Sequence, residues 1–419
     1  MRKFIGLLII GALLSTGQVA SAGPYEDGSA AYLRNDYSAA LKLWRPLAEQ
    51  GSASAQTSLG MMYANGRGVL QDYKEAAKWF RFSAEQGNAA AQTSLGVMYL
   101  NGRGVPQDYK EALKWFRLSA DQAGANAQNN LGAMYAKGQG VSQDYGEAVK
   151  WFRLSAEQGN ADAQFNLGRM YDEGLGVPQD HAEAVKWIRL SAEQGRASAQ
   201  YHLAVMYANG EGVPQDHKEA AKWYRLSAEQ GLASAQFKLG VMYGDGLGAP
   251  QDHAEAVKWY RKAAEQGNAD AQSSLGLMYE HGRGVPQDHA EAVKWYRLSA
   301  EQGDAAAQTS LGLMYRLGLG VPQDHAEAVK WYRKAAEQGN ADAQSSLGAM
   351  YGDGQGVAQD YVRAHMWLNL AAASSSGDDA KNATNNRNRL AAKMTPAQVE
   401  RAQEMARKCD ASKFKDCGW

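Results

Sequence analysis

Histidine recurs at one position in five segments that lie 36 residues apart, and repeated imidazoles could bind a metal ion. These residues are His181, His217, His253, His289 and His325. Zinc needs its nitrogen ligands within about 2.1 Å, whereas equivalent residues of stacked helices lie at least about 8–10 Å apart. Four further segments have tyrosine there, namely Tyr73, Tyr109, Tyr145 and Tyr361. We therefore interpret the position as aromatic packing at a helix start, and we predict no metal site and no cofactor.

Motifs of hydrolases and nucleotide-binding enzymes are almost absent from the sequence. It has no Gly-x-Ser-x-Gly, His-Glu-x-x-His, Walker loop or Lys-Thr-Gly. Its repeated Gly-x-Gly is not a dinucleotide fingerprint, because Gln179 stands where a third glycine should follow Gly174 and Gly176. One Ser-x-x-Lys, from Ser412 to Lys415, lacks the companion motifs of a β-lactam-hydrolysing enzyme. An enzyme needs convergent and non-repeated polar residues, so we predict no catalytic residues.

Aromatic and cationic side chains at variable positions are the strongest candidates for binding. In most segments the two residues after Ala-Gln are Ser, Thr or Asn. Three central segments instead have an aromatic residue at the first of these positions, and histidine or a cation lies nearby: Phe165, Arg169, Tyr201, His202, Phe237 and Lys238. Aromatic residues and arginine dominate binding hot spots, so we predict that these six residues hold a partner. The alternative is that the three rings pack between adjacent segments as core residues.

The elements that carry these residues repeat every 36 residues. Tryptophan marks the period without an insertion from Trp79 to Trp367, and Met-Tyr follows it from Met62-Tyr63 to Met350-Tyr351. A fixed period in this range is typical of a solenoid, because one repeat cannot bury its apolar face alone. The sequence therefore predicts an elongated all-α array rather than several globular domains.

Each repeat is predicted to contain two helices, as residues 158–187 illustrate. Apolar residues at i, i+4 and i+7 form one face of the first helix, which ends at Gly174 in a left-handed cap. The second helix begins at Asp180, and a capping box with Glu183 is expected to satisfy backbone N–H groups there. Gly168 lies in the middle of the first helix, which predicts a close approach of the two helices.

The chain is predicted to have four parts. Residues 1–22 form a signal peptide, residues 23–54 a capping half-repeat, residues 55–373 nine full repeats, and residues 374–419 a helical C-terminal cap. At one boundary Ala123-Gly124 replaces the usual Gly-x, which predicts a distorted turn.

The amino-terminal segment has the features of a secretory signal peptide. Arg2 and Lys3 precede the apolar run Phe4–Leu14, and small residues precede a cleavage site after Ala22. Because no stretch reaches about 20 apolar residues, we expect a periplasmic or secreted protein that is not inserted in the membrane. Cleavage removes two cations and no acid, so the formal charge changes from −1 to −3. No basic patch is present, which argues against nucleic-acid binding.

The C-terminal cap contains the two cysteines of the sequence, Cys409 and Cys417. An oxidising compartment would let them form a disulfide, and the alternative is two free thiols. A helix start is predicted at Thr395, which is followed by Pro at the first helical position and by Gln398. The preceding helix, expected over residues 378–393, is disfavoured by its asparagine-rich composition.

The repeat Ala-x-x-x-Leu-Gly-x-Met-Tyr-x-x-Gly-x-Gly-Val-x-Gln-Asp resembles the Sel1-like repeat, a relative of the tetratricopeptide repeat, over about residues 25–373. The resemblance implies a right-handed α/α solenoid whose first helices line a concave surface that holds other proteins. Exported bacterial members of that family act as regulators of periplasmic sensors, as envelope assembly factors or as host-interaction proteins. A cysteine-rich branch is linked to β-lactam binding or hydrolysis, but it has cysteine pairs within its repeats, and this sequence has none there.

We therefore expect a non-enzymatic and monomeric scaffold or regulator of the bacterial cell envelope that binds a protein or peptide partner in the concave groove. Two alternatives stay open at this point. One is a β-lactam-binding or β-lactam-hydrolysing enzyme, and the other is a secreted effector that contacts a host protein.

Overall fold

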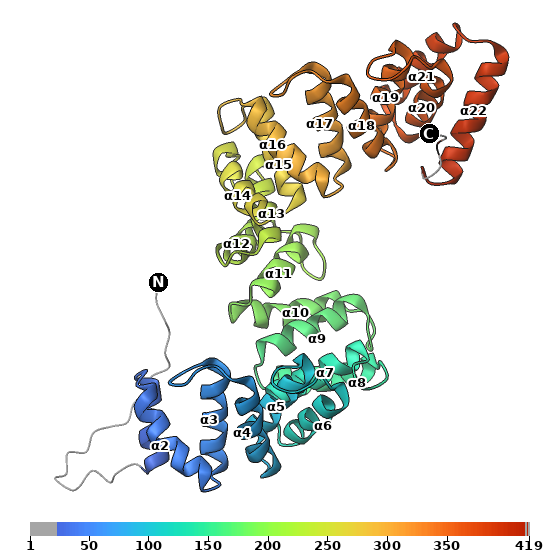
Figure 1. The fold of residues 1–419 in the computed structure, drawn as a ribbon. Coiled ribbons are helices and arrows are strands. Elements are labelled where there is room, and N and C mark those ends of the chain that lie inside the picture. Colours follow the sequence, from blue (N-terminus) through green and yellow to red (C-terminus); the bar gives the residue numbers. More distant parts are fainter. Residues whose placement is uncertain (1–22, 415–416, 418–419) are drawn as a thin grey trace. The chain divides into compact units, whose positions relative to one another are not determined.

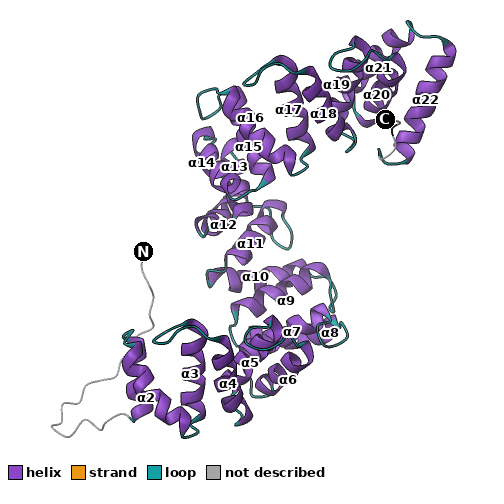
Figure 2. Cartoon of the chain, viewed as in Figure 1, coloured by secondary structure: helices purple, strands orange, loops and turns teal. Residues whose placement is uncertain are grey.

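The computed structural model of the protein describes residues 23–414 and Cys417. These residues form 22 helices and no strand (Figure 2). The chain divides into two compact units, residues 1–179 and residues 180–419, and each is described by itself. Within each unit, consecutive helices along the chain pack against one another (Figure 1). The prediction of an all-α array of 36-residue helix pairs is confirmed.

Nine helices of the described chain belong to the first unit. They are α1 (Pro24–Leu33), α2 (Tyr37–Glu49), α3 (Ala53–Asn65), α4 (Tyr73–Glu85), α5 (Ala89–Asn101), α6 (Tyr109–Ala120), α7 (Ala125–Lys137), α8 (Tyr145–Glu157) and α9 (Ala161–Glu173). The segment predicted as a capping half-repeat contains the complete helix pair α1 and α2. Trp44 of α2 donates a hydrogen bond to the carbonyl oxygen of Tyr25 in α1, at 3.0 Å.

The second unit contains the other thirteen described helices. They are α10 (His181–Glu193), α11 (Ala197–Asn209), α12 (His217–Glu229), α13 (Ala233–Asp245), α14 (His253–Glu265), α15 (Ala269–His281), α16 (His289–Glu301), α17 (Ala305–Leu317), α18 (His325–Ala336), α19 (Ala341–Asp353), α20 (Tyr361–Ser374), α21 (Gly377–Ala391) and α22 (Pro396–Ala411). We call the odd-numbered helices from α3 to α19 the first helices, and the even-numbered helices from α4 to α20 the second helices. No helix in the described part of the chain is both long and apolar enough to cross a membrane.

Glycine allows the two helices of a repeat to approach closely, as the sequence predicts. Gly240 lies in the middle of α13, and a Cβ atom placed on it would lie 2.6 Å from the ring of Tyr260 in α14. The first helix also ends as predicted, because Gly174 caps α9 with a φ of 68°. Buried alanine, leucine and methionine side chains fill the space between the helices, together with aromatic residues in most repeats.

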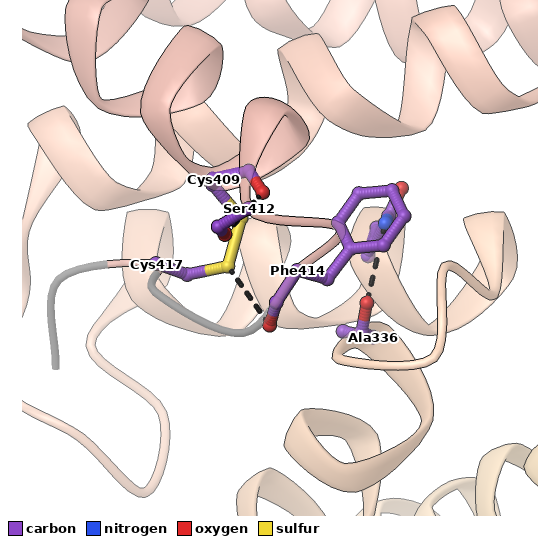
Figure 3. The surroundings of a disulfide bond; sticks show 6 residues. Ala336, Cys409, Ser412, Phe414 and Cys417 are labelled. Carbon is purple, nitrogen blue, oxygen red and sulfur yellow. Dashed lines mark hydrogen bonds between the residues drawn. A yellow bond between two sulfur atoms is a disulfide. The ribbon is translucent and has the colours of Figure 1, made fainter.

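The C-terminal cap consists of α21, α22 and the segment that follows them. Thr395 and Gln398 form a complete capping box at the start of α22, as predicted. Cys409 and Cys417 are joined as a disulfide, which closes a short loop after α22 (Figure 3). Phe414 of this loop lies against the turn between α18 and α19, where a Cβ atom on Gly339 would lie 2.9 Å from its ring. The loop therefore connects the end of α22 to the last full repeat.

Candidate functional site

The repeated arginine and tyrosine side chains connect successive repeats. The arginine of a second helix donates a hydrogen bond to the tyrosine hydroxyl of the following first helix. Arg117 in α6 bonds Tyr135 in α7 at 2.6 Å, and Arg189 in α10 bonds Tyr207 in α11 at 2.6 Å. The same pairing recurs along both units, from Arg45–Tyr63 to Arg333–Tyr351. These residues therefore have a structural role at the repeat boundaries.

Buried glutamines form a second series of bonds between repeats. Gln92 of α5 donates to the carbonyl oxygen of Ala84 in α4 at 3.1 Å, and it accepts from Gln122 at the end of α6 at 2.9 Å. In the second unit, Gln236 makes the equivalent bonds with Ala228 and Gln266. Because an unsatisfied amide in the core costs free energy, this arrangement stabilises the buried side chains of Gln92 and Gln236 at both ends. In the last repeat only the Nε2 atom of Gln344 is bonded, and its Oε1 atom has no partner among the described residues.

The first turn of each second helix differs from the prediction in one respect. Asp180 caps α10 by accepting a bond from the backbone N–H of Glu183 at 2.9 Å. The carboxylate of Glu183 does not complete a capping box. It accepts from the indole Nε1 of Trp187 at 3.1 Å and from Lys186 at 2.6 Å instead. The indole lies one turn ahead on the same helix. This indole bond is not common to all repeats, because the Nε1 atoms of Trp79 and Trp151 are buried without a hydrogen-bond partner in the described chain.

The repeated histidines lie at the starts of second helices, where the loop of the next repeat covers them. A Cβ atom on Gly284 would lie 2.2 Å from the carbonyl oxygen of His253. The Nδ1 atoms of His253, His289 and His325 are buried and have no hydrogen-bond partner. Within residues 23–414 and Cys417, no group of three or more His, Cys, Asp or Glu side chains could hold a metal ion.

The predicted binding residues of the first unit are Phe165 and Arg169, both in α9. Phe165 is only 6% exposed, which agrees with the core alternative for this ring. Arg169 forms an ion pair with Glu173 one turn ahead, so part of its charge is used within the helix.

Two of the predicted residues of the second unit, Tyr201 and Phe237, are partly exposed and pack on aromatic rings of the second helices. His202 is also partly exposed, and its ring lies 5.8 Å from that of Tyr201 in the same helix. The ring of Tyr201 lies 5.7 Å from that of Tyr224 in α12, and the ring of Phe237 lies 5.9 Å from that of Tyr260 in α14. Lys238 is exposed, with its ammonium group 5.7 Å from the Phe237 ring.

Burial of these rings also affects their ionisation. Burial raises the pKa of the Tyr201 hydroxyl. It also raises the pKa of Tyr260 to about 12, with a smaller contribution from the charge of Asp245. Both hydroxyls are therefore neutral at ordinary pH and act as hydrogen-bonding groups rather than as nucleophiles or bases.

One row of surface residues was not predicted from the sequence. One turn after the predicted aromatic position, the first helices of the second unit have apolar and partly exposed side chains: Val205, Val241, Leu277 and Leu313. Leu277 is 40% exposed. The residue before each Met-Tyr pair varies among repeats, and this variation could have indicated a surface position. An apolar residue at helical spacing has the pattern of core, which hides such a surface position.

The chain is similar to proteins with Sel1 repeats. The sequence model of the Sel1 repeat matches ten segments, residues 18–52, 53–88, 89–123, 125–160, 161–195, 197–232, 233–268, 269–304, 305–340 and 341–376. The segment predicted as a capping half-repeat, residues 23–54, thus overlaps a match of its own. None of the curated proteins matches this chain.

Two solved structures resemble the chain over most of its length. The protein c5321, described as a protective antigen of uropathogenic Escherichia coli strains with an SLR fold, is 37% identical. The match covers 94% of this chain and 92% of that protein, with a TM-score of 0.59. A Sel1 repeat protein from Oxalobacter formigenes is 34% identical over 82% of this chain and 98% of its own, with a TM-score of 0.56. With ten matched repeats and the helix pairs of its fold, the chain belongs to the Sel1 repeat family.

Proposed function

We propose that this protein is a non-enzymatic scaffold or regulator of the cell envelope, and that it binds a protein partner on the exposed side of its first helices. We call this side the first-helix face. The observation that carries the proposal is that repeated residues have structural roles, whereas variable residues are available for binding. The repeated Arg, Tyr, Gln, Asp and Glu side chains make bonds within or between repeats. Specificity must then come from the side chains that differ among repeats.

The variable side chains with the greatest capacity for binding lie in the second unit. Tyr201 and Phe237 are half-buried, so each offers part of a ring to a partner while its other contacts fix its position. The apolar residues Val205 and Val241 lie one turn further along the same helices, and the Lys238 ammonium lies near the Phe237 ring. A rigid aromatic anchor with apolar neighbours and a cation at its edge is typical of a binding hot spot.

The cellular location is part of the same proposal. The signal features of residues 1–22 lie outside the described residues, so they support export from the sequence alone. A protein described as a protective antigen is 37% identical to this chain, and an antigen of that kind has to be accessible outside the cytoplasm. Sequencing of the N-terminus of the mature protein, after fractionation of the cells, tests this part. A start at Gly23 is expected.

Site-specific photo-crosslinking tests the binding face directly. A benzoylphenylalanine residue is introduced at Lys238 on the first-helix face and, as the matched control, at Leu298, which is 45% exposed on second helix α16. The proposal expects a discrete crosslinked partner from the first position and none from the second. Equal crosslinking from both positions, or none from Lys238, would contradict it.

The variant Tyr201→Ala separates a binding role from a core role. Loss of a hot-spot anchor is expected to weaken capture of the crosslinked partner by about tenfold or more, while the melting temperature changes little. If the ring is mainly core, the truncation destabilises the array by about 3–5 kcal/mol, and capture falls only in proportion to the unfolded protein. That second result would remove Tyr201 from the binding site.

A further inference from the structure

A groove on the first-helix face of the first unit has a composition that points to a particular ligand. It lies between α3 and α5, with Phe80 of α4 among its lining residues, and its volume is about 360 Å³. We call it the α3–α5 groove. Met61, Val97 and Met98 provide further apolar lining. The volume is at the lower end of the range for ligand pockets, so the groove admits about one large side chain rather than a whole cofactor.

The same groove occurs a second time at equivalent positions, eight periods later in the second unit. There Ala349 and Gly352 of α19 take the places of Met61 and Ala64, and Leu368 takes the place of Phe80. The C-terminal groove has a volume of about 540 Å³ and is closed on one side by α21.

The aromatic residue at this position of the second helix has different neighbours in the two units. Tyr224 is the counterpart of Phe80, and the ring of Tyr201 packs on it. In the first unit the counterpart of Tyr201 is Thr57, whose hydroxyl bonds Ser83 at 2.7 Å. Phe80 is only 3% exposed, so it forms the buried floor of the groove. A partner side chain entering the α3–α5 groove would lie over Phe80 and between Met61 and Val97.

The charge of the groove indicates which kind of partner segment would bind there. The groove is lined by Arg103 and by no acidic residue. Arg103 is exposed, its guanidinium lies 5.9 Å from the ring of Tyr73, and in the described chain it has no acidic partner. Gln71 donates to the hydroxyl of Tyr73 at 3.0 Å, which fixes the ring under Arg103. A stacked guanidinium presents a planar set of N–H donors, which matches a carboxylate.

We propose that the α3–α5 groove binds a segment of a partner protein in which an apolar side chain enters the groove and an adjacent carboxylate pairs with Arg103. The carboxylate belongs either to an Asp or Glu side chain or to the C-terminus of the partner. This inference rests on the proposed function, because it names the chemistry of a partner on the first-helix face. It concerns the first unit, so it fails or succeeds independently of Tyr201.

Selection from random peptides tests the proposal without knowledge of the partner. The mature chain is immobilised and exposed to two libraries of 12-residue peptides, one displayed internally and one with a free C-terminus. The expected result is enrichment of peptides that share an apolar residue next to Asp or Glu, or next to the terminal carboxylate. The library that yields them identifies the source of the carboxylate. No enrichment, or enrichment of peptides without a carboxylate near the apolar residue, overturns the proposal.

Variants locate the binding of the enriched peptides. Arg103→Glu is expected to weaken binding by about tenfold or more, and Val97→Arg, which fills the groove, by a similar factor. The matched control is Arg283→Glu, which changes the same loop position of another repeat and should alter affinity by less than about twofold. Because Arg103 is exposed, its variant is expected to keep the wild-type melting temperature. If Val97→Arg does not fold, the affinity of the peptides for Arg103→Glu decides whether the groove is the binding site.

The two proposals are distinguishable by their variants. If the peptides lose affinity for Tyr201→Ala and retain it for Arg103→Glu, binding on the first-helix face stands and the α3–α5 groove is not the site. If crosslinking finds no partner on the first-helix face but the peptides require Arg103, the groove binds its ligand and the proposed function of the second unit is wrong.

Discussion

At the boundary between α6 and α7, Ala123 has a positive φ of 61°, in the left-handed region that favours glycine. Other boundaries have glycine at this position, such as Gly87 with a φ of 90°. The expected distortion of this turn is therefore absent, and the strain is taken by the backbone of Ala123. Gly124 then serves as the N-cap of α7 without a side-chain bond, whereas Asn88 caps α5 by accepting from Ala91 at 3.0 Å.

Ala123→Gly is expected to stabilise the first unit by about 1 kcal/mol, because the left-handed conformation costs an alanine about 1–2 kcal/mol. The reverse change, Gly87→Ala, is the matched control. A Cβ atom on Gly87 would have no neighbour within 4 Å, so its expected loss of about the same size reflects the backbone alone. Chemical denaturation of the three proteins measures both effects. Two substitutions that shift the midpoint in the same direction would contradict this account.

At the residue scale, the sequence predicts the turns better than the binding residues. Gly174 and Asp180 act on backbone groups within a few residues, so their roles follow from local rules. The environment of Tyr201 depends on Tyr224, which lies on another helix, and no local pattern specifies that contact. Phe165 and Tyr201 occupy the same position of their repeats, yet only Phe165 is fully buried. The distinction between groove and core is a tertiary property.

At the scale of elements, the disulfide loop after α22 has a clear structural consequence. It contains Phe414, which packs against the apolar cluster of α18, α19 and α20. Helix α21 has little core of its own, because Ala383 is its buried residue. The C-terminal cap packs mainly on α20, which contacts both α21 and α22, and the disulfide loop adds a contact with α18 and α19.

Reduction of Cys409–Cys417 is expected to destabilise the cap by about 2–3 kcal/mol, because it releases the closed loop in the unfolded chain. Phe414 then leaves its place beside Gly339. Intact mass after alkylation, with and without a reductant, establishes whether the disulfide is present in the protein from its native compartment. Hydrogen exchange in α21 and α22 should increase on reduction. Two alkylated thiols in the unreduced protein would refute the pairing.

The elements themselves could be predicted almost completely, with two exceptions. The starts and ends of the repeated helices follow from Asp and Gly, and the start of α22 follows from Thr395. The capping box predicted at Glu183 was wrong, because its carboxylate accepts bonds from Trp187 and Lys186 and not from the backbone at the helix start. The complete helix pair at the N-terminus was missed because the loop before Asp36 lacks Gly-x-Gly.

At the scale of the whole molecule, each repeat is connected to its neighbours by short-range bonds. The Arg–Tyr pairs join residues 18 positions apart, and the Gln–Gln pairs join residues 30 positions apart. In such an array, stability is approximately a sum of repeat and boundary contributions. A local defect should therefore lower the stability of one region without unfolding the whole chain, unlike the same defect in a two-state globular domain.

Gly104→Ala tests this property. Gly104 has a φ of 71°, and a Cβ atom on it would lie 2.0 Å from the carbonyl oxygen of Tyr73, so alanine must displace the loop from the start of α4. The left-handed backbone and the overpacking together should cost about 2–5 kcal/mol. Hydrogen exchange is expected to increase in α4, α5 and α6 and to remain unchanged in α15 to α20.

The displaced loop also carries Arg103, so peptides that require the α3–α5 groove should bind the variant more weakly. Gly87→Ala is the control, because it imposes the backbone cost without the clash. A uniform loss of protection in both units would mean that the array unfolds as one cooperative body, and the nearest-neighbour description of its stability would then have to be abandoned.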